Sequence, residues 1–149
     1  MLFKSIVLGC DHAGFELKET IKKYLQTAGI SVTDVGTFSG ESVDYPDFAV
    51  QAAKCVQEKT CDGGIVICGS GIGVSISANK IAGIRAALCS NSELARLSRL
   101  HNNANMLAMG ARFTTEEIAI KMVDAFLTTE FEGGRHIRRV DKIHALTNC

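Results

Sequence analysis

Five short apolar runs alternate with segments of helical periodicity along the chain, and this order limits the possible folds more than any other feature of the sequence. The runs cover residues 5–9, 30–35, 65–67, 84–89 and 105–109. Strands that alternate with helices in this way form a parallel sheet with helices on both faces. We therefore predict an α/β fold, a single Rossmann-like, doubly wound domain over residues 1–149 with a five-stranded parallel sheet.

Capping residues mark several of the expected helix boundaries. Ser90 or Asn91 can accept a hydrogen bond from the first turn of the fourth helix, and Thr114 or Thr115 can do the same for the fifth. After about residue 130 the sequence becomes basic, and two adjacent glycines can act as a hinge. We expect residues 130–149 to form a C-terminal helical tail.

Charge and composition argue against several classes of partner. The formal net charge is zero, so the chain lacks the basic field that suits nucleic acid or an anionic membrane. No apolar run is long enough to cross a membrane, and the N-terminus lacks the pattern of a signal peptide. The six cysteines include no C-x-x-C pair and no cluster with zinc spacing. This usage is typical of a reduced, cytoplasmic protein, and we expect neither a metal nor a cofactor.

The third apolar run leads directly into a glycine-rich turn that begins at Cys68. Gly69, Gly71 and Gly73 let the backbone approach a ligand and turn its N–H groups toward an anion or oxyanion. A thiol beside such groups is suited to proton or acyl transfer. The spacing G-x-G-x-G matches neither the dinucleotide fingerprint nor the Walker motif. Taken alone, the turn is also compatible with a cysteine that only packs in the core.

Three of the predicted strands end in loops that carry charged or reactive groups. Asp11 and His12 follow the first strand, Cys68 and Ser70 follow the third, and Arg112 follows the fifth. In open α/β sheets, ligands bind beyond the carboxyl ends of the strands. We therefore expect these loops to converge on one site.

The tail adds two arginines, Arg135 and Arg139, which share one face if the segment is helical. Two guanidinium groups on one face can hold a phosphate dianion, particularly with His12 or Arg112 nearby. The alternative is a solvated basic face whose charges have no ligand.

His101 ends the fourth predicted helix, which spans roughly 15 Å at 1.5 Å per residue. A helix of that length carries His101 back toward the amino ends of the strands, far from Cys68 of the same chain. The histidine then either interacts with the helix dipole at the C-terminus or serves the site of a neighbouring subunit.

Taken together, these motifs resemble the B-type ribose-5-phosphate isomerase family, whose relatives include allose-6-phosphate isomerase and the galactose-6-phosphate isomerase subunits. The resemblance covers essentially the whole chain. The segments that carry it are Gly9-Cys10-Asp11-His12-Ala13-Gly14, Asp44-Tyr45-Pro46, Ile67-Cys68-Gly69-Ser70-Gly71-Ile72-Gly73, Ala78-Asn79-Lys80, Gly83-Ile84-Arg85-Ala86, Ser98-Arg99-Leu100-His101-Asn102 and Glu132-Gly133-Gly134-Arg135-His136.

The resemblance implies an aldose–ketose isomerase of the non-oxidative pentose phosphate pathway that works through an enediolate without metal. It implies that Cys68 transfers a proton between C1 and C2 of the sugar. The Gly69–Gly73 turn and the Ser70 hydroxyl would stabilise the enediolate oxygen, and His101 and Asp11 would assist opening of the furanose ring.

The remaining family roles concern substrate binding and assembly. The resemblance implies that the phosphate is held by His12, Arg112, Arg135 and Arg139, and that Tyr45 and Asn102 line the sugar. Family members place this site between two subunits, so it implies a homodimer or a dimer of dimers, with the tail completing the site. That arrangement agrees with the position expected for His101.

Two features distinguish this chain within the resemblance. Position 70 is serine where many members carry threonine, and the segment around Val74 offers no carboxylate base, so the chain is similar to the branch that uses cysteine. The pair His101-Asn102 argues against galactose 6-phosphate as substrate. Two alternatives stay open: an isomerase for a hexose 6-phosphate such as allose 6-phosphate, and a non-catalytic domain that binds a phosphosugar or nucleotide.

Overall fold

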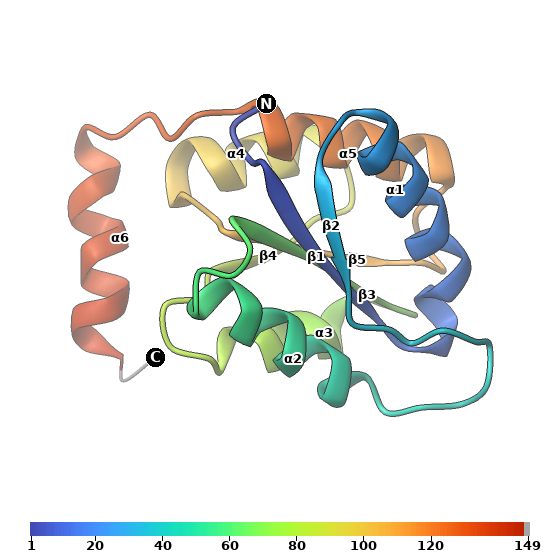
Figure 1. The fold of residues 1–149 in the computed structure, drawn as a ribbon. Coiled ribbons are helices and arrows are strands. Elements are labelled where there is room, and N and C mark those ends of the chain that lie inside the picture. The colour runs from blue at the N-terminus through green and yellow to red at the C-terminus, as the bar shows by residue number, and fades with distance from the viewer. Residues whose placement is uncertain (148–149) are drawn as a thin grey trace.

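The computed structural model describes residues 1–147, and Cys149 lies outside that range. Its centre is a single five-stranded parallel sheet in the order β2-β1-β3-β5-β4 (Figure 1). The strands are β1 (Ser5–Cys10), β2 (Ser31–Asp34), β3 (Gly63–Cys68), β4 (Ala86–Leu88) and β5 (Met106–Gly110). The predicted α/β architecture is confirmed.

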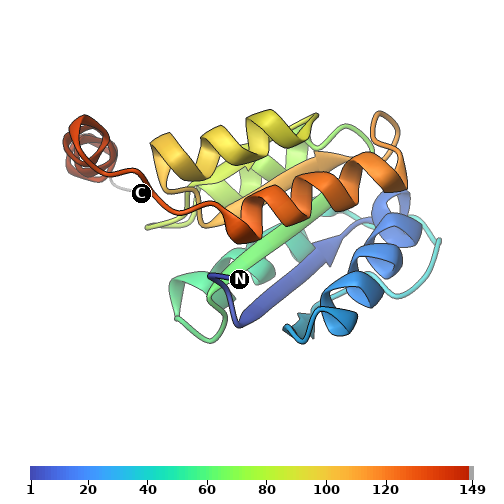
Figure 2. The same cartoon turned by 90° about the horizontal axis from the view of Figure 1, so that it is seen from above.

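Over the described residues there are six α-helices and one short 3-10 turn, His12–Gly14; the first four helices connect the strands, and the last two follow the final strand. The helices are α1 (Phe15–Thr27), α2 (Tyr45–Gln57), α3 (Ile72–Asn79), α4 (Ser92–Asn102), α5 (Glu116–Thr128) and α6 (Arg135–Leu146). Helices α1, α4 and α5 cover one face of the sheet, and α2 and α3 cover the other (Figures 1 and 2). Among the described residues, no helix is long and apolar enough to cross a membrane.

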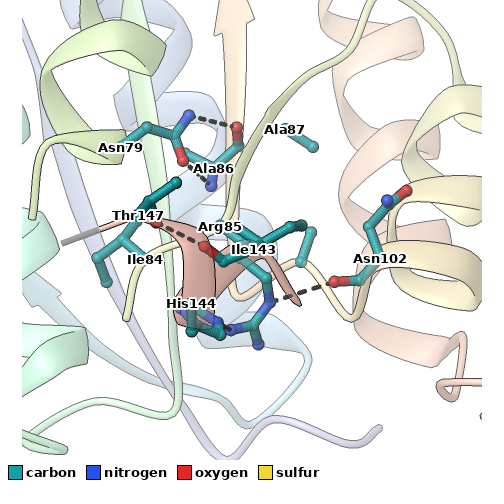
Figure 3. A pocket seen from close by; sticks show the side chains of 10 residues that line it. Asn79, Ile84, Arg85, Ala86, Ala87, Asn102, Ile143, His144 and Thr147 are labelled. Carbon is teal, nitrogen blue, oxygen red and sulfur yellow. Dashed lines mark hydrogen bonds between the residues drawn. The ribbon is translucent and has the colours of Figure 1, made fainter. Parts of the chain in front are cut away.

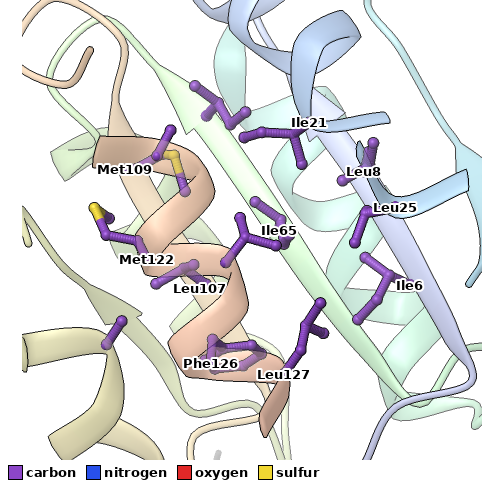
Figure 4. Close-up of a cluster of buried hydrophobic side chains, with 14 of the residues drawn as sticks. Ile6, Leu8, Ile21, Leu25, Ile65, Leu107, Met109, Met122, Phe126 and Leu127 are labelled. Atoms are coloured by element: carbon purple, nitrogen blue, oxygen red, sulfur yellow. The ribbon is translucent and has the colours of Figure 1, made fainter. Parts of the chain in front are cut away.

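Each face of the sheet has its own apolar core. Figure 4 shows the core under α1 and α5, where Ile65 and Leu107 of the central strands pack against Met122 and Phe126. Every residue of β3 is buried, because a central parallel strand has helices above and below it. The strand therefore offers a rigid base for the turn that follows Cys68.

The strand order reverses between β1 and β3. After β1 the chain forms β2 at one edge of the sheet, and it then returns to form β3 on the other side of β1. The residues after these strands stay in contact: the Asp11 N–H donates to the Ile67 carbonyl at 3.2 Å, and the Ala111 N–H donates to the Cys68 carbonyl at 2.8 Å. The loops after β1, β3 and β5 thus lie side by side at the position where α/β folds bind ligands.

Side-chain hydrogen bonds set several element boundaries. Of the candidate caps, Asn91 accepts from the Leu94 N–H at 2.9 Å and Thr115 accepts from the Ile118 N–H at 3.3 Å. Strand β4 is shorter than the predicted run over residues 84–89. The reason is local, because the Arg85 N–H donates to the Asn105 side chain at 2.8 Å instead of to a neighbouring strand.

The tail forms a helix as expected, and it stands apart from the body. A segment without helix or strand, residues 129–134, leads from α5 to α6, which lies beyond the sheet and packs against α4 (Figures 1 and 2). Only His136 and Val140 of α6 are buried. One side of this helix is therefore open to a partner.

Candidate active site

A cavity of about 410 Å³ opens at the carboxyl ends of β1, β3 and β5. Its lining brings together eight of the predicted site residues with Ala13, Ile72 and Ile76. The residues are Asp11, His12, Ala13, Tyr45, Cys68, Gly69, Ser70, Ile72, Gly73, Ile76 and Arg112. The expected convergence of the three loops is therefore present in a single chain.

The Cys68 thiol lies at the base of the glycine-rich turn and is 4% exposed. The backbone N–H of Gly71 donates to its Sγ atom at 3.2 Å. Gly71 has a φ of +78°, a left-handed conformation that suits glycine and directs its N–H back to the sulfur. A donor at this position stabilises negative charge on Sγ, which is what a thiol needs to act as a base.

Two other buried cysteines differ from Cys68 in their surroundings. Burial raises the pKa of Cys10 to about 12 and the pKa of Cys89 to about 11. Both thiols belong to the apolar core and stay protonated at neutral pH. Among the cysteines that the structure describes, Cys68 is the one that lines this cavity.

Two glycines of the turn make room for the side chains opposite them. A Cβ atom at Gly69 would lie 3.0 Å from the guanidinium carbon of Arg112, and one at Gly73 would lie 2.5 Å from the ring of Tyr45. Arg112 therefore rests directly on the turn at Gly69, and Tyr45 rests on it at Gly73. This packing places a cation and a phenol hydroxyl beside the thiol's loop.

The Asp11–His12 segment is held by hydrogen bonds on both residues. The Asp11 carboxylate accepts from the N–H groups of Ala13 and Gly14 at 3.0 and 3.2 Å. The Val43 N–H donates to His12 Nδ1 at 3.2 Å, so the proton of the neutral ring is on Nε2. His12 thus keeps one N–H donor that is not used by the loop.

Below this segment, a buried ion pair anchors the loop over residues 35–44. Lys18 is completely buried and donates to both carboxylate oxygens of Asp34 at 2.7 Å, and Lys22 adds a third bond at 2.8 Å. Burial alone would raise the pKa of Asp34, but the bonds from the two lysines and from the Gly36 N–H outweigh it and hold that pKa below its ordinary value. The loop that reaches His12 therefore starts from a fixed point.

Four predicted site residues lie elsewhere: His101, Asn102, Arg135 and Arg139. In the β3–β5 ladder Gly64 pairs with Met106 and Cys68 pairs with Gly110, so the chain that enters β5 is about 13 Å from the thiol along the strand. Helix α4 ends on that side, as its length predicts. Within one chain these residues do not line the cavity of Cys68.

A second cavity, of about 440 Å³, separates α6 from the end of α4 and the β4 edge of the sheet (Figure 3). Arg85 crosses it, donating to the Asn102 carbonyl at 3.1 Å and bonding His144 Nε2 at 2.8 Å. Burial lowers the pKa of Arg85, and the group keeps its charge at neutral pH. This arginine joins the end of α4 to α6.

Sequence reasoning missed a cluster of three groups around His101. Its Nε2 lies 3.8 Å from Glu132 Oε2, and His136 Nε2 lies 3.4 Å from the same oxygen. The two imidazole rings stack with centroids 4.4 Å apart. Burial and the positive charges nearby lower the pKa of His136. The spacing of residues 132 and 136 is visible in the sequence, but their contact with α4 depends on the tail.

Exposed apolar side chains around the mouth of the first cavity were also missed. Ile72 and Ile76 line this cavity. Leu88 and Phe113 line an adjoining pocket that shares Ser70 and Ile72 with it, and Phe113 is 75% exposed. The spacing of four between the two isoleucines is typical of one face of a helix, but their exposure depends on how α3 is placed in the fold.

Comparison with known proteins identifies the family. The sequence profile described as Ribose/Galactose Isomerase matches residues 6–143. The chain belongs to this family. One relative is ribose-5-phosphate isomerase B of Escherichia coli K12. It is 51% identical to this chain over 143 residues, which cover 96% of each protein.

Solved structures of family members share the fold. Ribose-5-phosphate isomerase B from Clostridium thermocellum superposes with a TM-score of 0.94 at 51% identity, covering 95% of this chain and 96% of that one. The enzyme from Mycoplasma genitalium with bound ribulose-5-phosphate gives a TM-score of 0.92 at 44% identity, covering 95% of each chain. The chain is thus an isomerase of this family by sequence and by fold.

Proposed function

We propose that the protein interconverts ribose 5-phosphate and ribulose 5-phosphate through an enediolate, with Cys68 as the base. The observation that carries this proposal is the hydrogen bond from the Gly71 N–H to the Cys68 sulfur at the edge of a cavity with several cationic and polar groups. The role fits cytoplasmic sugar metabolism in the non-oxidative pentose phosphate pathway.

The chemistry needs one proton to move between adjacent carbons. In the open-chain aldose, the Cys68 thiolate removes the proton from C2, and the electron pair forms the C1–C2 double bond while O1 becomes the enediolate oxygen. The same thiol returns the proton to C1, and the O2 hydroxyl proton transfers to O1, which leaves the C2 ketone. The Ser70 hydroxyl and the first-turn N–H groups of α3 are suited to stabilise the oxyanion.

Substrate binding follows from the charges on the cavity wall. The free Nε2–H of His12 and the guanidinium of Arg112 are suited to the phosphate, while the Tyr45 hydroxyl can contact the sugar. Asp11 assists opening of the furanose ring. These groups form one half of the proposed site.

We propose that a second copy of the chain supplies the other half. His101 and Asn102 at the end of α4, with Arg135 and Arg139 of α6, then serve the cavity of the partner. The exposed apolar groups in this cavity and in the pocket that adjoins it, Phe113 among them, support this arrangement, since a partner would cover them. A two-fold dimer creates two identical sites.

The direct test is to incubate the purified protein with ribose 5-phosphate and to follow ribulose 5-phosphate. We expect conversion in both directions, at an unchanged rate in excess EDTA, because the steps above need only a base and oxyanion donors. Allose 6-phosphate in a parallel assay tests the alternative substrate. Phosphosugar binding without conversion of either sugar would overturn the proposal and leave a binding protein.

A further inference from the structure

The cluster of His101, Glu132 and His136 lies outside the cavity of Cys68 and comes from three separate segments. His101 is in the last turn of α4, Glu132 is in the segment before α6, and His136 is in the first turn of α6. One ligand atom from each lies within 4.8 Å of the other two. Two imidazoles and one carboxylate are the donors that Zn²⁺ and related divalent transition metals prefer.

The backbone holds these three groups together without the help of their side chains. The Glu132 N–H donates to the Leu100 carbonyl at 3.0 Å, which ties the segment to the residue beside His101. The His136 N–H donates to the Gly133 carbonyl at 3.0 Å and closes the turn that brings its ring back to Glu132. The backbone positions of the three residues are therefore set before any ligand arrives, and only the side chains have to adjust.

The distances are close to those of a tetrahedral site. Donors at 2.0–2.2 Å from a metal stand about 3.3 Å from one another. Glu132 Oε2 already lies 3.4 Å from His136 Nε2 and 3.8 Å from His101 Nε2. Only the two imidazoles, which stack face to face, must turn so that both lone pairs point to one centre.

The three donor side chains differ in their exposure to solvent, and the difference suits a metal site with one coordination position left for water. The His136 side chain is 8% exposed, whereas those of His101 and Glu132 are 37% and 56% exposed. An ion can enter from this exposed side, which in the proposed dimer faces the partner's cavity, and keep a water as its fourth ligand. The positive charges of Arg135 and Arg139 act on His136 and oppose a cation, so we expect reversible binding rather than a permanent structural metal.

We propose that His101, Glu132 and His136 form an inhibitory site for Zn²⁺ or a similar divalent transition metal. Coordination occupies the Nε2 lone pair of His101 and removes that ring from furanose opening. The inhibitory effect rests on the proposed isomerase function, whereas the binding of the metal does not. The protein would then work without metal and lose activity when zinc is in excess.

Binding is tested with Co²⁺, a spectroscopic substitute for Zn²⁺, on the full chain in the Cys68→Ala background, so that the active-site thiol cannot compete. We expect visible absorption typical of nitrogen and oxygen ligands, without a thiolate charge-transfer band, saturating at one ion per chain. Glu132→Gln and His136→Gln should each weaken binding about tenfold or more, because losing even an indirect partner of a metal typically costs about 10- to 100-fold. Glu130→Gln removes the same charge two residues earlier, and it should bind like the parent.

Inhibition is tested separately, with Zn²⁺ and ribose 5-phosphate, each variant being compared with its own rate in EDTA. Zinc should inhibit the chain with native Cys68 and the Glu130→Gln variant, and EDTA should restore their activity. The Glu132→Gln and His136→Gln variants should need at least tenfold more zinc for the same degree of inhibition. Equal Co²⁺ affinity in all variants, a thiolate band, or no binding would overturn the metal site. Absence of isomerase activity in EDTA would instead refute the proposed function and leave the Co²⁺ result intact.

Discussion

Cys68 is the cysteine whose sulfur accepts a backbone N–H at the cavity, and it is the residue on which the proposed chemistry depends most. We expect Cys68→Ala to lower turnover by about 100- to 10,000-fold, the usual contribution of a positioned base, with phosphate binding nearly unchanged. Steady-state rates with ribose 5-phosphate, together with inorganic phosphate as a competing ligand, measure the two effects.

Cys55→Ala is the matched control for this thiol, because Cys55 is half-buried and lies on α2 away from the cavity. It should keep the parent rate. If Cys68→Ala retains more than a few per cent of turnover, another group is the base.

Arg135 and Arg139 are exposed on α6, one helical turn apart. Replacing either by alanine should raise KM by the equivalent of about 1.5–3 kcal/mol, the value of a charge-assisted hydrogen bond, with a smaller change in kcat. Lysine should substitute poorly because it lacks the planar fork. Arg138→Ala on the same helix is the control, and an unchanged KM in both test variants would mean that these arginines are only a solvated basic face.

At the residue scale, the sequence predicted which groups share the cavity but not how they are oriented. Asp11, Cys68 and Arg112 could be grouped because the ends of adjacent parallel strands must meet. The contact between Val43 and the His12 ring could not be predicted, because it depends on the path of an irregular loop. The His101–Glu132–His136 cluster needed the position of α6, which no local pattern encodes.

At the scale of elements, the buried pair of Lys18 and Asp34 links α1, β2 and the loop above the cavity. Asp34→Asn leaves the buried Lys18 ammonium with Glu19, at 3.1 Å, as its remaining carboxylate partner in the described part of the chain. We expect it to lower the free energy of unfolding by about 3 kcal/mol. Glu117→Gln, which breaks an exposed pair with Lys121, should cost less than about 0.5 kcal/mol. Denaturant unfolding of the variants measures both.

The same pair gives a pH dependence of defined sign. The pKa of Asp34 is lower in the folded chain than its ordinary value of 3.8, so its ionised form stabilises the fold above about pH 4. That contribution is lost as the pH falls through the folded pKa. Between about pH 5 and pH 2, the unfolding free energy of the parent should therefore fall more steeply than that of Asp34→Asn. Parallel curves would assign the acid sensitivity to other carboxyl groups.

The types of the elements could be predicted from the periodicity of the sequence. The start of α3 and the burial of Lys18 could not. Helix α3 begins at Ile72 because left-handed Gly71 directs the chain into the helix, and the apolar pattern alone did not fix that start. Lys18 adjoins the apolar position Leu17, and nothing in the helical pattern distinguishes a buried lysine from one that reaches the solvent. Its partner Asp34 arrives only when β2 pairs with β1.

At the scale of the whole molecule, the proposed site needs two chains, and subunit mixing tests this. Cys68→Ala and His101→Ala should each be nearly inactive alone. In a mixed dimer one site carries both lesions and the other carries neither, so activity should return as subunits exchange, to at most half of the parent rate per mixed dimer. Differently tagged subunits isolate the mixed species, and verified mixed dimers without activity would refute the shared site.

Helix α6 has a further consequence for the dynamics of the chain. It buries only His136 and Val140, whereas β3 is buried throughout. Local opening of α6 therefore exposes little apolar surface, and its amide hydrogens should exchange with solvent deuterium long before those of β3. If a second chain covers this helix, the protection of its amide hydrogens will rise with protein concentration, while that of the β3 amides stays constant. The exchange rates of α6 then measure whether two chains have assembled.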